Sequence, residues 1–133
     1  MDDVFVGSLM SSPVHTVTAD TSLQHAGTVM LETNIGSIII VGAEEQLEGI
    51  LTATEFIRII ADGNPDPGAI VGTVMTTEVI TTTADEPIQT VADLMIKHGI
   101  QHLPITADGE VIGIISSTDL AAYLSSLRDP SPP

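Results

Sequence analysis

The sequence contains no cysteine and no tryptophan, and only 2% of its 133 residues are aromatic. Without cysteine the chain has no disulfide bond, no thiolate nucleophile and no sulfur ligand for a zinc or iron–sulfur centre. A hydrophobic core must therefore be built mainly from Ile, Val, Leu, Ala and Met side chains. Hydrophobic residues make up 43% of the chain and the mean hydropathy is +0.36, which suffices for one compact domain or two small, joined halves.

Positive charge is also scarce. Three basic residues stand against 18 acidic ones, which gives a net charge of −15 at pH 7. Nucleic acids and anionic membranes would be repelled, so neither is an expected partner. The near absence of lysine favours a halophilic archaeon as the source, because a very salty cytoplasm screens repulsion between acidic side chains. An ordinary acidic protein is the simpler alternative.

The N-terminus lacks the features of a signal peptide. The chain begins Met1-Asp2-Asp3, which is acidic where a signal peptide is basic. No apolar run approaches the roughly 18 residues that a membrane span needs. We therefore expect a cytoplasmic protein.

The chain contains an internal repeat. Residues 6–35 and 71–100, compared 65 positions apart, are identical at 11 of 30 positions. After a one-residue difference in length, the match resumes 64 positions apart, where Gly49 aligns with Gly113. We expect one repeat at 4–62, a linker at 63–70, a second repeat at 71–127 and a disordered tail at 128–133.

Each repeat has the pattern of a β-α-β-β-α unit, because β-branched runs alternate with apolar residues at helical spacing. The pattern predicts an α/β (α+β) fold. Neither half alone buries enough surface to be stable, so we expect the two repeats to pack through their sheets into a disc with approximate two-fold symmetry. The expected elements are short apolar segments at Val6–Met10 and Val71–Met75, strands at Val14–Thr18 and Val79–Thr83, helices ending near Thr33 and His98, strand pairs Ile38–Val41 with Leu47–Thr52 and Leu103–Thr106 with Val111–Ser116, and closing helices from about Thr54 and Thr118.

Local signals mark several ends of these elements. Thr21 followed by Gln24 resembles a capping box, and Asp85 is expected to cap the equivalent helix. Gly99 is a natural helix stop. The pair Asp108-Gly109 predicts a hairpin turn.

One stretch occurs twice and carries the candidate chemistry. We call Gly49–Glu55 the first junction and Gly113–Asp119 the second junction; in each, an apolar strand end is followed by hydroxyl residues and a carboxylate. A strand that leads into a helix presents free N–H groups and a positive dipole, which suits a phosphate or another anion. The hydroxyls can donate to phosphate oxygens, and the carboxylate can accept hydrogen bonds from a sugar diol. Plain helix capping is the ordinary alternative.

These junctions, together with Met10-Ser11-Ser12-Pro13-Val14 and Gly99-Ile100-Gln101-His102-Leu103-Pro104-Ile105, resemble a tandem pair of cystathionine β-synthase (CBS) domains across roughly residues 4–127. Each motif alone is weak, but all of them occur in order. The resemblance implies a regulatory pair that binds an adenosine-containing ligand (AMP, S-adenosylmethionine, ADP, ATP or NAD) between the repeats and is not an enzyme. It also implies a homodimer of two pairs.

The resemblance implies two composite sites. In one, Asp119 would hold the ribose diol and Ser116 and Thr118 the phosphate or its equivalent. The other repeat would then supply the adenine pocket. In the second site Glu55, Thr54 and Thr52 take these roles, and the longer Glu55 side chain detunes the sugar contact. The residues expected opposite the second junction are Pro13, Val14, His15, Thr16, Ile35, Gly36 and Ser37, and those expected opposite the first junction are Val79–Thr81, including Thr81, with Gln101 and His102.

No basic residue stands at Gln101-His102 or Gly36-Ser37, so AMP or S-adenosylmethionine is favoured over ATP. His102 would carry charge only below about pH 6.5 unless its pKa is raised. The chain would then modulate an unidentified partner protein. A scaffolding or oligomerisation module without ligand is the alternative, and a small nucleotide-acting enzyme has little support because no nucleophile or acid/base pair is visible.

A metal site is not expected. His98 and His102 have the spacing of a helical metal pair, but Gly99 should end the helix between them. There is no clear third ligand. Solvent-exposed or hydrogen-bonded histidines are the simpler interpretation.

Overall fold

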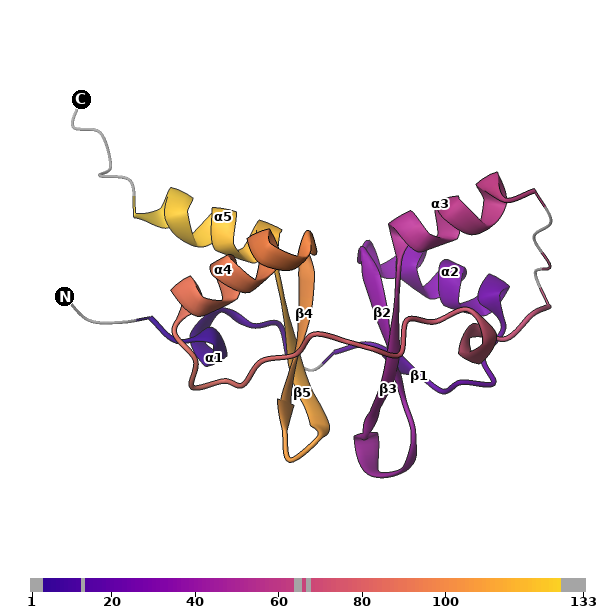
Figure 1. The fold of residues 1–133 in the computed structure, drawn as a ribbon, viewed down its shortest axis with the longest axis horizontal. Helices are drawn as coiled ribbons and strands as arrows, with labels where there is room; N and C mark the ends of the chain where they lie inside the picture. The colour runs from indigo at the N-terminus through magenta and orange to yellow at the C-terminus, as the bar shows by residue number, and fades with distance from the viewer. Residues whose placement is uncertain (1–3, 13, 64–65, 67, 128–133) are drawn as a thin grey trace. The chain divides into compact units, whose positions relative to one another are not determined.

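The computed structural model describes residues 4–12, 14–63, 66 and 68–127 (Figure 1). These residues form two compact units, which we describe separately. The first-repeat unit comprises His15–Val79 with Gly109–Val111. The second-repeat unit comprises the segment up to Val14, Ile80–Asp108 and the described residues from Ile112 onward. The predicted tail, and Pro13 in the predicted adenine pocket, lie outside the described residues.

The first-repeat unit is a three-stranded sheet with two helices. Strand β1 pairs in parallel with β2, and β2 pairs antiparallel with β3, in the order β1-β2-β3. All five residues of β2 are buried, and aliphatic side chains fill it from Ile38 to Val41. The elements are β1 (Thr16–Val17), α2 (Leu23–Thr33), β2 (Ser37–Val41), η1 (Ala43–Glu45), β3 (Leu47–Thr52), α3 (Ala53–Ala61) and η2 (Val71–Thr73).

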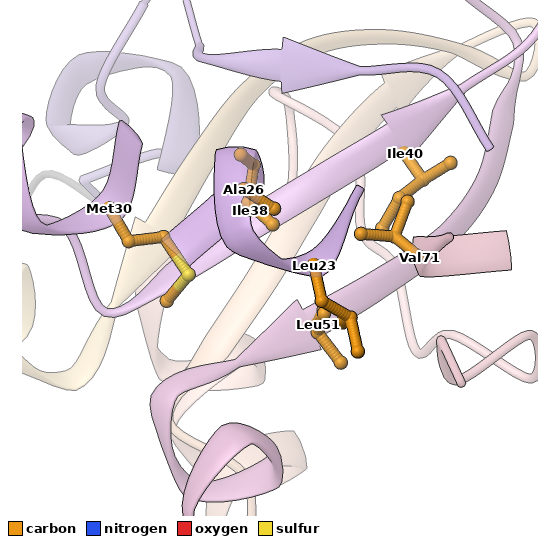
Figure 2. Packing of buried hydrophobic residues seen from close by; sticks show 7 residues of the cluster. All are labelled: Leu23, Ala26, Met30, Ile38, Ile40, Leu51 and Val71. Carbon is orange, nitrogen blue, oxygen red and sulfur yellow. The ribbon is translucent and has the colours of Figure 1, made fainter. Parts of the chain in front are cut away.

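The core of this unit lies between α2 and one face of the sheet. Figure 2 shows α2 contributing three side chains, which face aliphatic side chains of β2 and β3. The buried residues are Leu23, Ala26, Met30, Ile38, Ile40, Leu51 and Val71. Val71 lies in the second sequence repeat, yet it completes the core of the first.

The second-repeat unit repeats this plan with a two-stranded sheet. Its elements are α1 (Val6–Leu9), α4 (Ile88–His98), β4 (His102–Ala107), β5 (Glu110–Ser116) and α5 (Ser117–Ser126). Its core mirrors the first, with the buried residues Val6, Val91, Met95, Leu103, Ile105 and Ile115. Val6 comes from the start of the first sequence repeat, so the two units have exchanged their opening segments.

Backbone hydrogen bonds hold each exchanged segment. Ser11 pairs with Ile114 of β5 through N···O distances of 2.8 and 3.1 Å. Thr76 pairs with Ile50 of β3 through two distances of 3.0 Å. These two bridges are equivalent in the repeats, and each lies next to a junction.

Most predicted elements are confirmed within one or two residues. Helices α2 and α4 end at Thr33 and His98, and Gly99 is the left-handed cap of α4 with φ 64°. Asp108 and Gly109 both have positive φ (54° and 82°), as a two-residue hairpin turn requires. The closing helices begin one residue before the predicted threonines.

The strand predicted at Val79–Thr83 is wrong, because only a single bridge joins Thr82 to Ile105. The Thr82 N–H donates to the Pro104 carbonyl, and the Thr106 N–H donates to the Thr82 carbonyl. Pro104 has no N–H to continue the ladder.

Two predicted helix caps are also wrong. The α2 cap is Ser22 rather than Thr21, and its hydroxyl accepts from the His25 N–H at 3.0 Å. Thr21 is held in the preceding turn, since its carbonyl accepts from the Val71 N–H. Asp85 does not cap α4, because its carboxylate accepts from the Thr83 hydroxyl and the helix starts after Pro87.

Within the described ranges, no helix is both long and apolar enough to cross a membrane.

Candidate functional site

The second junction is built by the end of β5 and the start of α5. Ser116 is the N-cap residue, and its hydroxyl oxygen accepts from the Asp119 N–H at 3.2 Å. In return, the Asp119 Oδ2 atom accepts from the Ser116 N–H at 2.8 Å. This capping box fixes the carboxylate at the mouth of the helix. The other carboxylate oxygen, Oδ1, accepts no hydrogen bond from the part of the chain that the structure describes.

The N-terminus of α5 is largely satisfied within its own unit. The Ser117 N–H donates to the Gln101 carbonyl at 2.9 Å. With the Asp119 N–H bonded to Ser116, the Thr118 N–H remains as the donor of the first turn. The Thr118 side chain is exposed, and its hydroxyl makes no hydrogen bond among the described residues. The junction thus offers one free carboxylate oxygen beside one hydroxyl and one amide donor.

The first junction has the same capping box, but its carboxylate accepts more hydrogen bonds. Thr52 caps α3, and the Glu55 N–H donates to its hydroxyl oxygen at 3.3 Å. Glu55 Oε1 accepts from the Thr52 N–H at 3.0 Å and from the Thr52 hydroxyl at 3.2 Å. Glu55 Oε2 accepts from the Thr76 hydroxyl at 2.7 Å. Both oxygens of this carboxylate are therefore engaged, while the Thr54 side chain is exposed.

Each junction is flanked by the residues just before β2 or β4 of its own unit. The Ala53 N–H donates to the Gly36 carbonyl at 2.9 Å, as the Ser117 N–H does to Gln101. Ser37 is buried and lies opposite Thr52 in the sheet. The structure thus places Gly36 and Ser37 beside the first junction and Gln101 beside the second. The contacts expected across the repeats stay predictions.

His102, the first residue of β4, lies near the second junction. Burial lowers the pKa of the His102 imidazole, and the negative charge of Asp119 opposes this effect only in part. The side chain is therefore uncharged at neutral pH. It supplies no positive charge for a phosphate.

The remaining predicted residues lie in the strand region of each unit. His15 is exposed just before β1, and Thr16 pairs with Ile39. Thr81 is half-buried next to the Thr82 bridge. Sequence reasoning missed Thr76, although Ser11 and Thr76 are hydroxyl residues at equivalent positions. Among the described residues, no three His, Asp or Glu side chains come together as metal ligands.

Comparison with known proteins identifies the family. The CBS domain model matches residues 6–62 and 71–126, which is nearly the whole chain. The chain belongs to the CBS domain family. CBS domain-containing protein YhcV of Bacillus subtilis is 32% identical over 117 residues, covering 87% of this chain and 82% of YhcV. The chain has the CBS-pair fold with mixed helices and strands.

Solved CBS structures agree with this assignment. The CBS domain pair of protein MJ0100, in complex with 5′-methylthioadenosine and S-adenosyl-L-methionine, has a TM-score of 0.88 and 27% identity and covers 96% of this chain and 100% of that chain. A conserved protein from Pyrococcus horikoshii has a TM-score of 0.85 and 28% identity over 100% of both chains.

Some CBS relatives are much longer proteins. Protein MJ1225 of Methanocaldococcus jannaschii is 31% identical over 121 residues, which are 91% of this chain and 43% of MJ1225. The homoserine O-acetyltransferase of Methanococcus vannielii is 30% identical over 90% of this chain but only 25% of the enzyme. The chain thus spans less than half the length of these relatives.

Proposed function

We propose that this CBS pair is a regulatory module that binds an adenosine-containing ligand through its second junction. The observation that supports this is Asp119: a capping box holds its carboxylate, while its Oδ1 atom and the hydroxyl of the preceding Thr118 make no hydrogen bond to any described residue. A ribose diol can donate to that oxygen, while the threonine donates to a polar group attached to the ribose. The second wall of the site, assigned by the resemblance to the other repeat, stays a prediction.

S-adenosylmethionine and AMP fit the electrostatics better than ATP. The chain carries a net charge of −15, and the His102 pKa is lowered by burial, so little positive charge is available for a polyphosphate. S-adenosylmethionine carries a sulfonium cation, which a negative surface attracts. The complex of the MJ0100 pair with that ligand supports the same choice.

Calorimetry at high salt tests this function. S-adenosylmethionine, AMP, ATP and NAD would be titrated into wild type, Asp119→Asn and Asp93→Asn, where Asp93 is an exposed acid on α4 that serves as the matched control. We expect binding to wild type and Asp93→Asn, with about tenfold weaker binding to Asp119→Asn. Absence of binding to wild type by all four compounds would remove the sensor function.

We further propose that the module forms a homodimer through apolar helix faces. Leu31 on α2 and Ile96 on α4 are 85% and 82% exposed and occupy equivalent positions of the two repeats. Ile60 on α3 and Leu124 on α5, also equivalent, are both 65% exposed. Large apolar side chains that recur on both units indicate a surface covered by another chain. Sedimentation of wild type against Leu31→Glu with Ile96→Glu tests this, because a monomeric wild type would contradict it.

The same faces favour scaffolding as the second candidate function. It would be supported by a dimer that binds none of the four compounds. For the sensor, the output is a shift in the population of conformations recognised by a partner protein, limited by the ligand's differential affinity for them. No catalytic role is proposed. A cytoplasmic location and a halophilic archaeal source stay predictions of the sequence.

A further inference from the structure

The two junctions differ in how many hydrogen bonds their carboxylates already accept. Glu55 accepts three, from the Thr52 N–H, the Thr52 hydroxyl and the Thr76 hydroxyl. Asp119 accepts one, from the Ser116 N–H. Two of the three donors that Glu55 uses are hydroxyl groups, the same chemical kind as the donors of a sugar diol.

Side-chain length explains the difference. Thr76 and Ser11 are equivalent hydroxyl residues, and each is fixed beside its junction by a backbone bridge. Only Thr76 reaches a carboxylate, at 2.7 Å, because Glu55 has one methylene more than Asp119. The Ser11 hydroxyl makes no hydrogen bond to Asp119 in the described structure. The extra methylene is therefore what lets the exchanged segment close the first junction.

The hydroxyl groups of the two N-cap residues also differ in whether they donate a hydrogen bond. The Thr52 hydroxyl donates its proton to Glu55. The Ser116 hydroxyl accepts from the Asp119 N–H and makes no donated hydrogen bond within the described residues. A ligand at the second junction thus meets a free acceptor and a free donor. At the first junction it would first have to displace the hydrogen bonds that Thr52 and Thr76 already make to Glu55.

We propose that the first junction is occupied by the chain's own Thr76, so that each chain holds a single adenosyl ligand, at Asp119. This rests on the proposed function and assigns Glu55 and Thr76 as the residues that set the stoichiometry. The first junction is a structural clamp that ties the exchanged segment to α3. The ligand is therefore anchored at the second junction only.

Titration calorimetry with S-adenosylmethionine tests the proposal. Wild type should bind one molecule per chain, Glu55→Gln should change the affinity less than twofold, and Asp119→Asn should weaken it about tenfold. The double variant Glu55→Asp, Thr76→Ala copies the second junction and should bind two molecules per chain. Asp119→Glu should lose binding, since the longer side chain can reach Ser11. Ser11→Ala, the matched control for Thr76, should still bind one.

Two molecules per wild-type chain, or equal losses for Glu55→Gln and Asp119→Asn, would overturn the single-site proposal and leave the proposed function standing. One molecule per chain in the folded double variant would also overturn it, with circular dichroism and thermal unfolding confirming the fold. No binding to wild type would remove the proposed function as well.

Discussion

Two substitutions at the second junction distinguish the hydroxyl that caps α5 from the hydroxyl that does not. Ser116→Ala removes the hydroxyl oxygen that accepts from the Asp119 N–H, whereas Thr118→Ala removes a hydroxyl without a partner among the described residues. Loss of a serine cap costs about 1 kcal/mol. Unfolding entropy is about 2.1 cal/mol/K per residue, so for 133 residues this cost lowers the Tm by about 3–4 °C. Thr118→Ala should stay within about 0.5 kcal/mol of wild type.

Thermal unfolding without ligand measures these two effects. Thr52→Ala and Thr54→Ala at the first junction provide the matched pair, and the cap variant should again be the less stable one. Thr118→Ala should instead weaken adenosyl-ligand binding several-fold, because a hydrogen bond to the ligand is lost. Equal destabilisation by Ser116→Ala and Thr118→Ala would refute the division of roles.

Other predictions concern the backbone, the core and pH. An added Cβ at Gly99 (φ 64°) would meet no atom within 4 Å, so Gly99→Ala should cost only what the left-handed backbone costs, about 1 kcal/mol in urea unfolding. Gly99→Asn should cost less, because Asn34 ends the equivalent helix at φ 56°. Gly49→Ala should cost about 1–3 kcal/mol in the same assay, because its Cβ would lie 2.5 Å from a methionine sulfur and 2.9 Å from a carbonyl oxygen; an unchanged midpoint would contradict this. Burial lowers the pKa of the His102 imidazole in the folded protein below its unfolded value of 6.5. As the pH falls below 6.5 the unfolded chain therefore takes up a proton first, and stability is lost from there down through the folded-state pKa. Wild type should thus lose more stability than His102→Gln between pH 7.5 and 5.5. Asp119→Asn should lower the His102 pKa further by NMR titration, and a raised pKa would contradict the attributed cause.

Elements were predictable where the deciding signal is local. Gly99 adopts the left-handed conformation that ends α4, and Asp108-Gly109 forms the expected turn, because these residues favour such conformations on their own. The caps were less predictable, since several neighbouring residues can cap. The choice of Ser22 over Thr21 depends on a carbonyl that is held by the distant Val71.

The exchange of opening segments could not be read from the sequence. Val6 and Val71 occupy equivalent positions, so the same apolar pattern is compatible with either core. Only the tertiary contacts distinguish the alternatives. The repeat boundaries expected from the sequence therefore describe the duplication of the chain, while the units follow the packing.

The residues of the two junctions could be predicted from the sequence, but the hydrogen bonds that their carboxylates already accept could not. The repeated hydroxyl–carboxylate pattern pointed to Asp119 and Glu55, and both form capping boxes. Nothing near Glu55 in the sequence shows that its second oxygen is taken by Thr76, which lies 21 residues later. One methylene group and one distant hydroxyl thus separate two junctions that appear alike in the sequence.

The exchanged segments also constrain how the chain can be made and cut. Val6 leaves the ribosome long before Ile115, with which it shares a buried cluster, so the second-repeat unit cannot mature until the chain has been synthesised past Ile115. A protease or a cloning boundary placed between the sequence repeats would deprive each unit of a core residue supplied by the other half. Each sequence repeat therefore needs the other in the same chain to complete its hydrophobic core.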